Sequence, residues 1–242
     1  MVAEGRGRNP NLGLAASTGL DPGIGSRGLN EMSDVNTMWG RRIPEHLLAS
    51  ADLQRLTAEV ASESISQATE LIVACYRAAN KVLICGNGGS AADAQHVSAE
   101  FLNRLNSSLN RPGLPAIALT TDTSFLTSYA NDCGYDGVFE RQVLALGNAG
   151  DVLIAITTSG NSRNVLKAVE AARTKNLRTI GLTGQGGALA EMVECPIVVP
   201  SRDTQHLQEC FLSIEHVICA LVEQSLFGDH SGAINCDPQS NP

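Results

Sequence analysis

Two hydrophobic patterns alternate along the chain between about residues 44 and 226. Short, nearly all-apolar runs are typical of strands buried on both faces of a sheet; they lie at 81–85, 116–119, 152–157, 178–183 and 196–200. Segments with apolar residues at helical spacing lie at 44–79, 90–105, 123–130, 138–147, 162–175, 187–194 and 204–226. This alternation predicts an α/β fold with a doubly wound, mostly parallel five-stranded sheet flanked by helices.

The two ends of the chain lack both patterns. Glycine, proline, serine and asparagine dominate residues 1–38, which predicts a disordered leader. Residues 39–227 then form one domain with an N-terminal helical segment, and residues 228–242 form a flexible tail. A chain of 242 residues has room for one good core.

Composition and charge narrow the function classes. A formal net charge of −8 argues against a nucleic-acid surface, which needs a basic patch. No run of 18 apolar residues and no apolar signal-peptide core is present, so we expect no membrane partner. The seven cysteines are scattered without a CxxC pair, which is typical of reduced thiols and indicates a cytoplasmic protein.

A glycine-rich loop follows the first predicted strand, in the stretch CGNGGSAADAQHVSAEF at 85–101. Glycines let backbone amides approach a ligand closely, and the N-terminus of the next helix favours an anion. A tight strand-to-helix turn is the simpler interpretation. Gly86, Gly88 and Ala91 also fit a dinucleotide fingerprint, but the expected acidic residue is too distant, because the second strand ends near Asp122.

A hydroxyl-rich loop, TTSGNS, follows the third predicted strand. Thr157, Thr158, Ser159 and Ser162 place four hydroxyls at the start of a helix. Asn161 or Ser162 could simply cap that helix. Four hydroxyls together with the glycine loop favour a phosphate cradle, because hydroxyls and free amides can bind phosphate without a lysine or arginine.

Four polar side chains lie on two predicted helices. His96 and Glu100 are one turn apart, and Gln208 and His216 are about two turns apart on the last helix. Histidine and glutamate at this spacing can bind a metal ion or transfer protons. Taken singly, Gln208 fits a surface position and His216 fits a core histidine with satisfied hydrogen bonds.

These segments resemble phosphoheptose isomerases, a family of the sugar isomerase (SIS) superfamily. The resemblance covers about residues 45–226 and rests on the two loops, on ANDCGYDGVF and on QECFLSIEHV. It implies an aldose–ketose isomerase that converts D-sedoheptulose 7-phosphate to D-glycero-D-manno-heptose 7-phosphate through an enediol. It also implies a role in heptose biosynthesis for the cell envelope and its lipopolysaccharide, and a homotetramer with sites between subunits.

The resemblance also assigns residues. It implies Glu100 and His216 as the catalytic acid/base pair, and one zinc ion per subunit bound by His96, Glu100, Gln208 and His216. The implied substrate-binding residues are Asn87, Gly88, Gly89, Ser90, Asn131, Asp132, Thr157, Thr158, Ser159, Ser162 and Gln208. Two features depart from the family pattern: Thr157 stands where relatives carry serine, and the leader has no counterpart.

Two non-enzymatic alternatives remain at this stage. Related SIS proteins bind the replication initiator DnaA, and others sense a sugar phosphate. The presence of both Glu100 and His216, and a phosphate loop without an arginine, favours the enzyme.

Overall fold

The computed structural model describes residues 38–107 and 109–228. The predicted leader, except Met38, and the predicted tail, except Gly228, lie outside the described residues. Contacts divide the chain into two units, Met1–Glu45 and His46–Pro242. The sheet and the candidate site lie within the second unit, and the domain boundaries remain predictions.

The sheet has five strands, all parallel, in the order β2-β1-β3-β4-β5. The strands are β1 Val82–Cys85, β2 Ala116–Ala118, β3 Val152–Thr157, β4 Arg178–Thr183 and β5 Cys195–Val198. The predicted fold class is therefore confirmed. The order reverses direction between β1 and β3, and such a switch point is where ligands bind in sheets of this kind.

The helices follow the predicted order, with shifts at their ends. They are α2 Met38–Arg77, α3 Gly89–Leu102, α4 Thr123–Cys133, η3 Tyr135–Gly137, α5 Val138–Leu146, α6 Arg163–Thr174, α7 Leu189–Met192 and α8 Thr204–Phe227. Two differences have clear causes. After α3, the amides of Leu105 and Asn106 bond to the Glu223 carboxylate instead of continuing the helix. The segment around α7 is a single turn, because Gly186 and Gly187 have positive φ.

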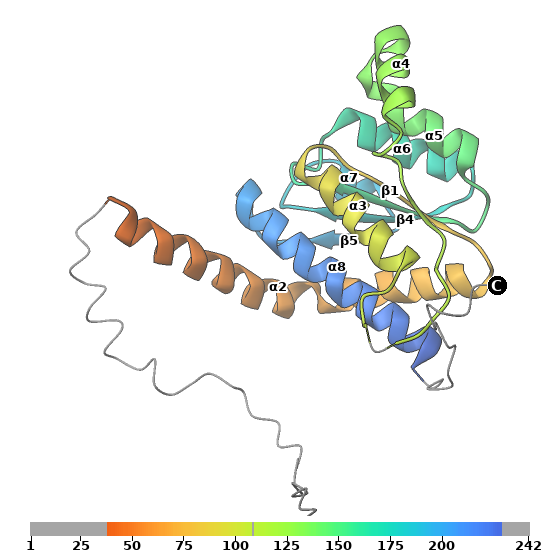
Figure 1. Ribbon diagram of the computed structural model, residues 1–242. Helices are drawn as coiled ribbons and strands as arrows, with labels where there is room; N and C mark the ends of the chain where they lie inside the picture. Colours follow the sequence, from red (N-terminus) through yellow and green to blue (C-terminus); the bar gives the residue numbers. More distant parts are fainter. Residues whose placement is uncertain (1–37, 108, 229–242) are drawn as a thin grey trace, which may run out of the picture. The chain divides into compact units, whose positions relative to one another are not determined.

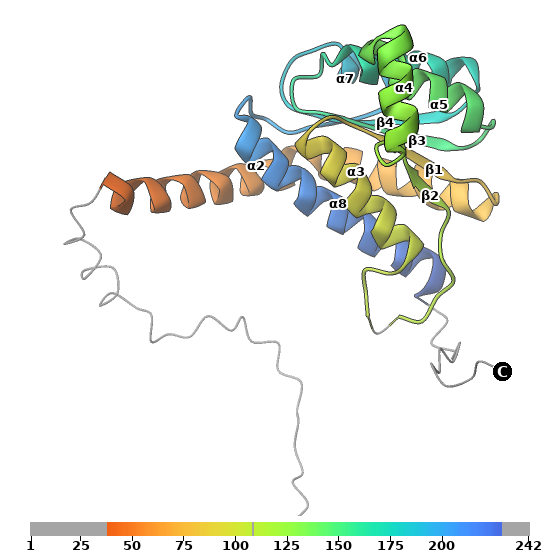
Figure 2. The ribbon, with the colours of Figure 1, turned by 45° about the horizontal axis from the view of Figure 1, so that its top comes forward.

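Helices cover both faces of the sheet (Figures 1 and 2). Alternate residues of each strand point to opposite faces. Val82 and Ile84 of β1 therefore join a core with α3 and α8, whereas Leu83 and Cys85 join a core with α5 and α6. Figure 2 shows α5, α6 and α7 on one side of the sheet and α3 and α8 on the other.

By length and composition alone, α8 could cross a membrane, with 24 residues and a mean hydropathy of 1.4. Its apolar residues have another explanation. Leu207, Phe211 and Val222 are buried in the core beneath the sheet, and the helix also carries a buried glutamate, Glu215. These are properties of a core helix, so α8 is weak evidence for a membrane span.

Candidate active site

Two loops meet at the carboxyl ends of β1 and β3. These strands are paired, with Cys85 opposite Ala155, so the segments that follow them emerge side by side. One is the glycine loop before α3 and the other is the hydroxyl-rich loop before α6. Both lie at the switch point of the sheet.

A pocket of about 220 Å³ lies between these loops and the first turns of α8. Most of its lining was singled out from the sequence. The lining residues are Asn87, Ser90, Ile156, Thr157, Thr158, Ser159, Ser162, Thr204 and Gln208. Residues from three distant parts of the chain are thus brought to one place, and their binding roles remain predictions.

The hydroxyls of the β3–α6 loop contact one another instead of capping the helix. Thr157 Oγ1 lies 2.9 Å from Ser162 Oγ and 3.4 Å from Ser159 Oγ. Ser162 is at the N-cap of α6 but makes no side-chain cap hydrogen bond. The Asn161 side chain is engaged with Ser159 O and the Ala188 amide. The simpler interpretation, a single capping residue, is therefore wrong for this loop.

The N-termini of α3 and α6 are open to an anion. Neither helix has a side-chain cap, and neither has an acidic residue in its first turn. By contrast, Asp203 caps α8 by accepting from the amides of Gln205 and His206. Uncapped helix N-termini present free N–H groups and a positive dipole end, which suits phosphate.

Asn87 is held in place by neighbours that the sequence did not reveal. Its side-chain amide exchanges two hydrogen bonds of 2.9 Å with the amide of Asn164, and the Tyr135 hydroxyl donates to its Oδ1 at 3.2 Å. Thr204, which lines the pocket, was also missed. Its position as the first residue of the last helix was the available signal. Tyr135 lies in the stretch ANDCGYDGVF but was not singled out, and no pattern marked Asn164.

The glycine loop approaches Gln208 closely. A Cβ added at Gly89 would lie 1.9 Å from Gln208 Nε2, so the side chain of Gln208 lies directly over the loop. Gly88 has a φ of 57°, a conformation that favours glycine. Glycine is therefore required at position 89 by the close approach of Gln208, and is favoured at position 88 by the positive φ.

His96, Glu100 and His216 meet between α3 and α8. His96 Nε2 lies 2.8 Å from His216 Nε2, and 3.8 Å from Glu100 Oε1. Two facing Nε2 atoms at this distance share one hydrogen, so at least one ring is neutral and offers a lone pair. The group can therefore accept a proton or a cation.

A buried ion pair fixes the end of α3 near Glu100. Arg111 donates to the backbone carbonyls of Glu100 and Phe101 at 2.7 and 2.8 Å. Its Nε also bonds Glu223 Oε1 of α8 at 2.8 Å, and both side chains are almost fully buried. A cation at a helix C-terminus is favourable, so Arg111 ties α3 and α8 together where Glu100 is presented.

Two carboxyl groups, one buried and one half-buried, lie beside this group. Burial raises the pKa of Glu215 to about 9, with a further contribution from Asp93, and neither oxygen of Glu215 has a hydrogen-bond partner among the described residues. Burial also raises the pKa of Asp93 to about 6, against a lowering effect of His96. Glu215 is therefore a neutral acid at pH 7.

Asn131 and Asp132 do not reach the pocket within this chain. Asn131 Nδ2 donates to Asp132 Oδ1 at 2.8 Å, both side chains are exposed, and α4 has no buried residue. Their substrate-binding role remains a prediction.

The predicted zinc ligands were tested for fit by their chemistry. Two imidazoles and a carboxylate are a normal zinc donor set, and His96, Glu100 and His216 supply them within the distances above. However, a different trio in the described part of the chain has donor atoms that all lie within 4.8 Å of one another. It consists of His46, His206 and Glu209. The structure thus contains a candidate His/Glu metal site that the sequence did not predict.

Residues 48–184 match the SIS domain family. The phosphoheptose isomerase of Roseiflexus sp. (strain RS-1) is 47% identical over 200 residues, which cover 82% of this chain and 99% of the relative. The chain belongs to the phosphoheptose isomerase family. The phosphoheptose isomerase of Shewanella sp. (strain ANA-3) is 48% identical over 190 residues, 77% of this chain and 95% of that one.

Solved structures agree with this assignment. Phosphoheptose isomerase GmhA from Neisseria gonorrhoeae has a TM-score of 0.73 and 41% identity, over 77% of this chain and all of the other. A phosphoheptose isomerase from Francisella tularensis has a TM-score of 0.74 and 38% identity, over 78% of this chain and all of the other. The Vibrio vulnificus NanR protein, at 15% identity and a TM-score of 0.59, covers 83% of this chain and 67% of that one, and shares the fold alone.

Proposed function

We propose that this protein converts D-sedoheptulose 7-phosphate to D-glycero-D-manno-heptose 7-phosphate, a step of heptose biosynthesis for the cell envelope. The observation that carries the proposal is the pocket at the switch point, where the family's loops and Gln208 come together. Family membership at 47% identity supports the same reaction. Nothing in the described residues favours binding to DnaA or a role as a sensor.

In this proposal the phosphate lies between the two uncapped helix N-termini. The hydroxyls of Thr157, Ser159 and Ser162 and the free amides of α3 and α6 bind its oxygens. Binding the remote phosphate supplies orientation for the reacting carbons. Asn87 and Gln208 hold the sugar hydroxyls, because both amide side chains border the pocket.

The chemistry moves one proton between adjacent carbons. A base removes the proton from C1 of the ketose, an enediol forms, and a proton is returned to C2 while the hydroxyl proton moves from O1 to O2. We assign Glu100 as the base at carbon and His216 as the partner that transfers the proton between oxygens. Their proximity to His96, at the distances given above, supports this division.

Zinc would be held by His96, Glu100, Gln208 and His216. When bound, it would supply Lewis-acid stabilisation of the enediol oxygens. With or without zinc, Arg111 and Glu223 hold α3 against α8, so that Glu100 and His216 are presented to the same site from the two helices.

We also propose a cytoplasmic homotetramer with sites between subunits. Large apolar side chains are exposed on α2 and α8, among them Leu47, Val60 and Val217. Exposed apolar faces of this kind are typical of subunit interfaces. A neighbouring subunit against α4 would also give Asn131 and Asp132 a route to a site.

The direct test is incubation of the purified protein with D-sedoheptulose 7-phosphate, with detection of the aldose by NMR. Sedoheptulose without phosphate is the matched substrate control and should turn over far more slowly. Binding of the phosphorylated sugar without turnover would favour a sensor. Binding to DnaA without either activity would favour the initiator-binding alternative.

A further inference from the structure

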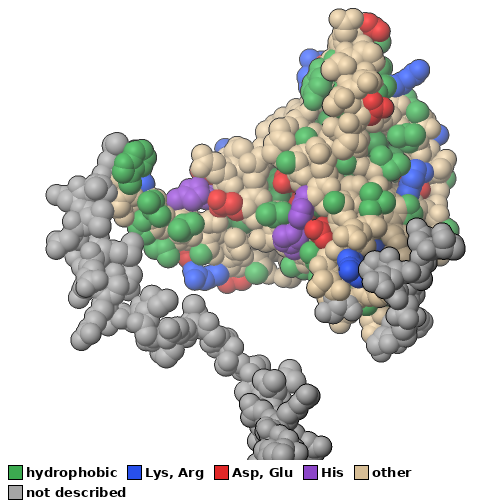
Figure 3. Space-filling model, in the orientation of Figure 1, with side chains coloured by type: hydrophobic (Ala, Val, Ile, Leu, Met, Phe, Trp, Pro, Cys, Tyr) green, Lys and Arg blue, Asp and Glu red, His purple; other side chains and the backbone are tan. Residues whose placement is uncertain are grey.

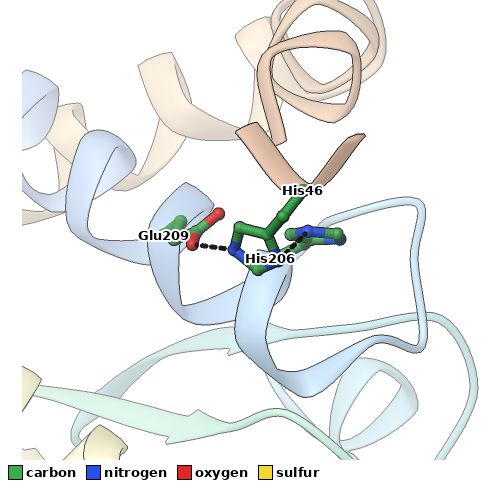
Figure 4. Close-up of side chains that lie close together, drawn as sticks. All are labelled: His46, His206 and Glu209. Atoms are coloured by element: carbon green, nitrogen blue, oxygen red, sulfur yellow. Dashed lines mark hydrogen bonds and ion pairs between the residues drawn. The ribbon is translucent and has the colours of Figure 1, made fainter. Parts of the chain in front are cut away.

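A second histidine–glutamate group joins α2 to the start of α8. His46 Nε2 lies 3.0 Å from Glu209 Oε1, and His206 Nε2 lies 3.2 Å from His46 Nδ1. Figure 4 shows the His46 ring between the other two side chains. One donor atom from each of the three residues lies within 4.8 Å of the others.

The donors are only partly satisfied by one another. Glu209 Oε2 is buried and accepts no hydrogen bond of good geometry from the described residues. The other oxygen of this carboxylate, Oε1, is paired with His46 Nε2. In the contact between His206 Nε2 and His46 Nδ1, one nitrogen accepts and therefore carries a lone pair. A charged carboxylate and a neutral imidazole are the forms that bind metals.

A carboxylate also lies near the other nitrogen of the His206 ring. Its Nδ1 lies 3.9 Å from Asp203 Oδ1, and Asp203 is fixed by its cap bonds at the start of α8. A carboxylate behind a metal-binding histidine is a common feature that sets the direction of the ring. At 3.9 Å the Asp203 carboxylate is beyond direct hydrogen-bond distance and acts on the His206 ring only through its charge, while Nε2 faces His46.

We propose that His46, His206 and Glu209 bind a divalent transition-metal cation of the zinc class, as a site distinct from the catalytic group. Two imidazoles and one carboxylate are a donor set of that class. The described histidines pair as His46 with His206 and His96 with His216. Figure 3 shows histidine side chains in two separate groups on one face of the molecule.

The consequence is structural. The cation links α2 to the first turns of α8, which carry Thr204 and Gln208 of the pocket. A ligand that binds only the folded state raises its stability by mass action. The cation therefore raises the melting temperature, and turnover does not depend on it chemically.

The test uses Co²⁺ as a spectroscopic probe of the full chain stripped of metal. His216→Asn first removes a ligand of the proposed catalytic ion, so that any Co²⁺ still bound can be assigned to the second histidine group. We expect this variant to bind one Co²⁺ per chain with visible d–d absorption. Adding His46→Gln, or Glu209→Gln if the former folds poorly, should weaken that binding at least about a hundredfold.

Glu59→Gln is the matched control, since Glu59 is an exposed glutamate on α2 outside the group. In the His216→Asn background, Glu59→Gln should leave both Co²⁺ affinity and the Zn²⁺-induced rise in melting temperature unchanged, whereas His46→Gln should abolish that rise. Equal Co²⁺ affinity with and without His46→Gln would overturn the proposal. So would the absence of any Co²⁺ binding in the His216→Asn variant.

Discussion

Glu100 is the residue whose chemistry decides the mechanism. It lies one turn from His96 on α3, and the Arg111 side chain donates to the backbone carbonyl of Glu100. We predict that Glu100→Gln lowers turnover by roughly two to four orders of magnitude, the usual effect of removing a general acid or base. Steady-state kinetics on sedoheptulose 7-phosphate measures this.

The fold of this variant should be intact, because glutamine has nearly the same shape and only the 3.8 Å ion pair is lost. Circular dichroism and the elution volume are the controls. Metal content should be measured alongside, since Glu100 is also a proposed ligand. Turnover near that of the wild type in a folded variant would exclude Glu100 as the base.

Glu215 gives a pH-dependent prediction about stability. Burial raises the pKa of its carboxyl from 4.5 to about 9, so the folded state keeps a proton that the unfolded state loses between these values. Its contribution is therefore most favourable below about pH 4.5 and is lost as pH rises toward 9. Glu215→Gln cannot ionise and should be less sensitive to pH.

We expect the stability of Glu215→Gln, relative to the wild type, to increase by about 2–4 kcal/mol between pH 5 and pH 8. Urea unfolding at both pH values measures it, and Asp93 must be considered because its pKa of about 6 falls in the same range. A constant difference between the two proteins would mean that Glu215 is ionised in the folded state.

At the scale of residues, the sequence indicated which side chains line the pocket better than it indicated which residues hold those side chains in place. The hydroxyl loop and Gln208 were found because they follow strands or interrupt an apolar helix. Tyr135 and Asn164 were missed because they act by holding Asn87, across 48 and 77 residues of chain. No local pattern reports a contact at that separation.

At the scale of elements, the Arg111–Glu223 pair holds α3 to α8. Glu223 also accepts from the amides of Leu105 and Asn106, so one carboxylate ends α3 and neutralises the buried arginine. We predict that Glu223→Gln destabilises the fold by about 3–5 kcal/mol, since it leaves a buried charge without its partner. Chemical denaturation measures the loss.

The matched control is Glu194→Gln, which breaks the exposed pair of Arg178 and Glu194. Exposed pairs contribute only about 0–1 kcal/mol. If the two substitutions lower the free energy of unfolding equally, the Arg111–Glu223 pair does not hold α3 and α8 together.

The strands were predictable because most of their residues are buried, so that each reads as a nearly continuous apolar run. The predicted limits of β3 and β4 agree with the structure. The ends of α3 and the length of α7 were not predictable, because Glu223 and the positive φ of Gly186 and Gly187 decide them. Tertiary contacts and backbone strain leave no periodic signal.

At the scale of the whole molecule, the long helices carry more apolar surface than one chain covers. Leu56 and Val60 of α2 are 43% and 57% exposed, and Val217 and Leu221 of α8 are 46% and 37% exposed. Scattered exposed apolar residues are ordinary, but exposed apolar residues one turn apart on each of two helices are typical of a subunit interface. The second histidine group lies between the same two helices.

We therefore predict a homo-oligomer, most simply a tetramer, that Val60→Glu disrupts. A charge placed in a closed apolar interface is repeated in every subunit by symmetry, so its desolvation cost is multiplied. Leu144→Glu is the matched control, because Leu144 is 41% exposed but lies on α5, on the other face of the sheet. Sedimentation velocity should show smaller species for Val60→Glu and unchanged assembly for Leu144→Glu. If the active sites lie between subunits, the smaller species formed by Val60→Glu should also have a lower turnover per chain. An active wild-type monomer at assay concentration would contradict both the assembly and the shared site.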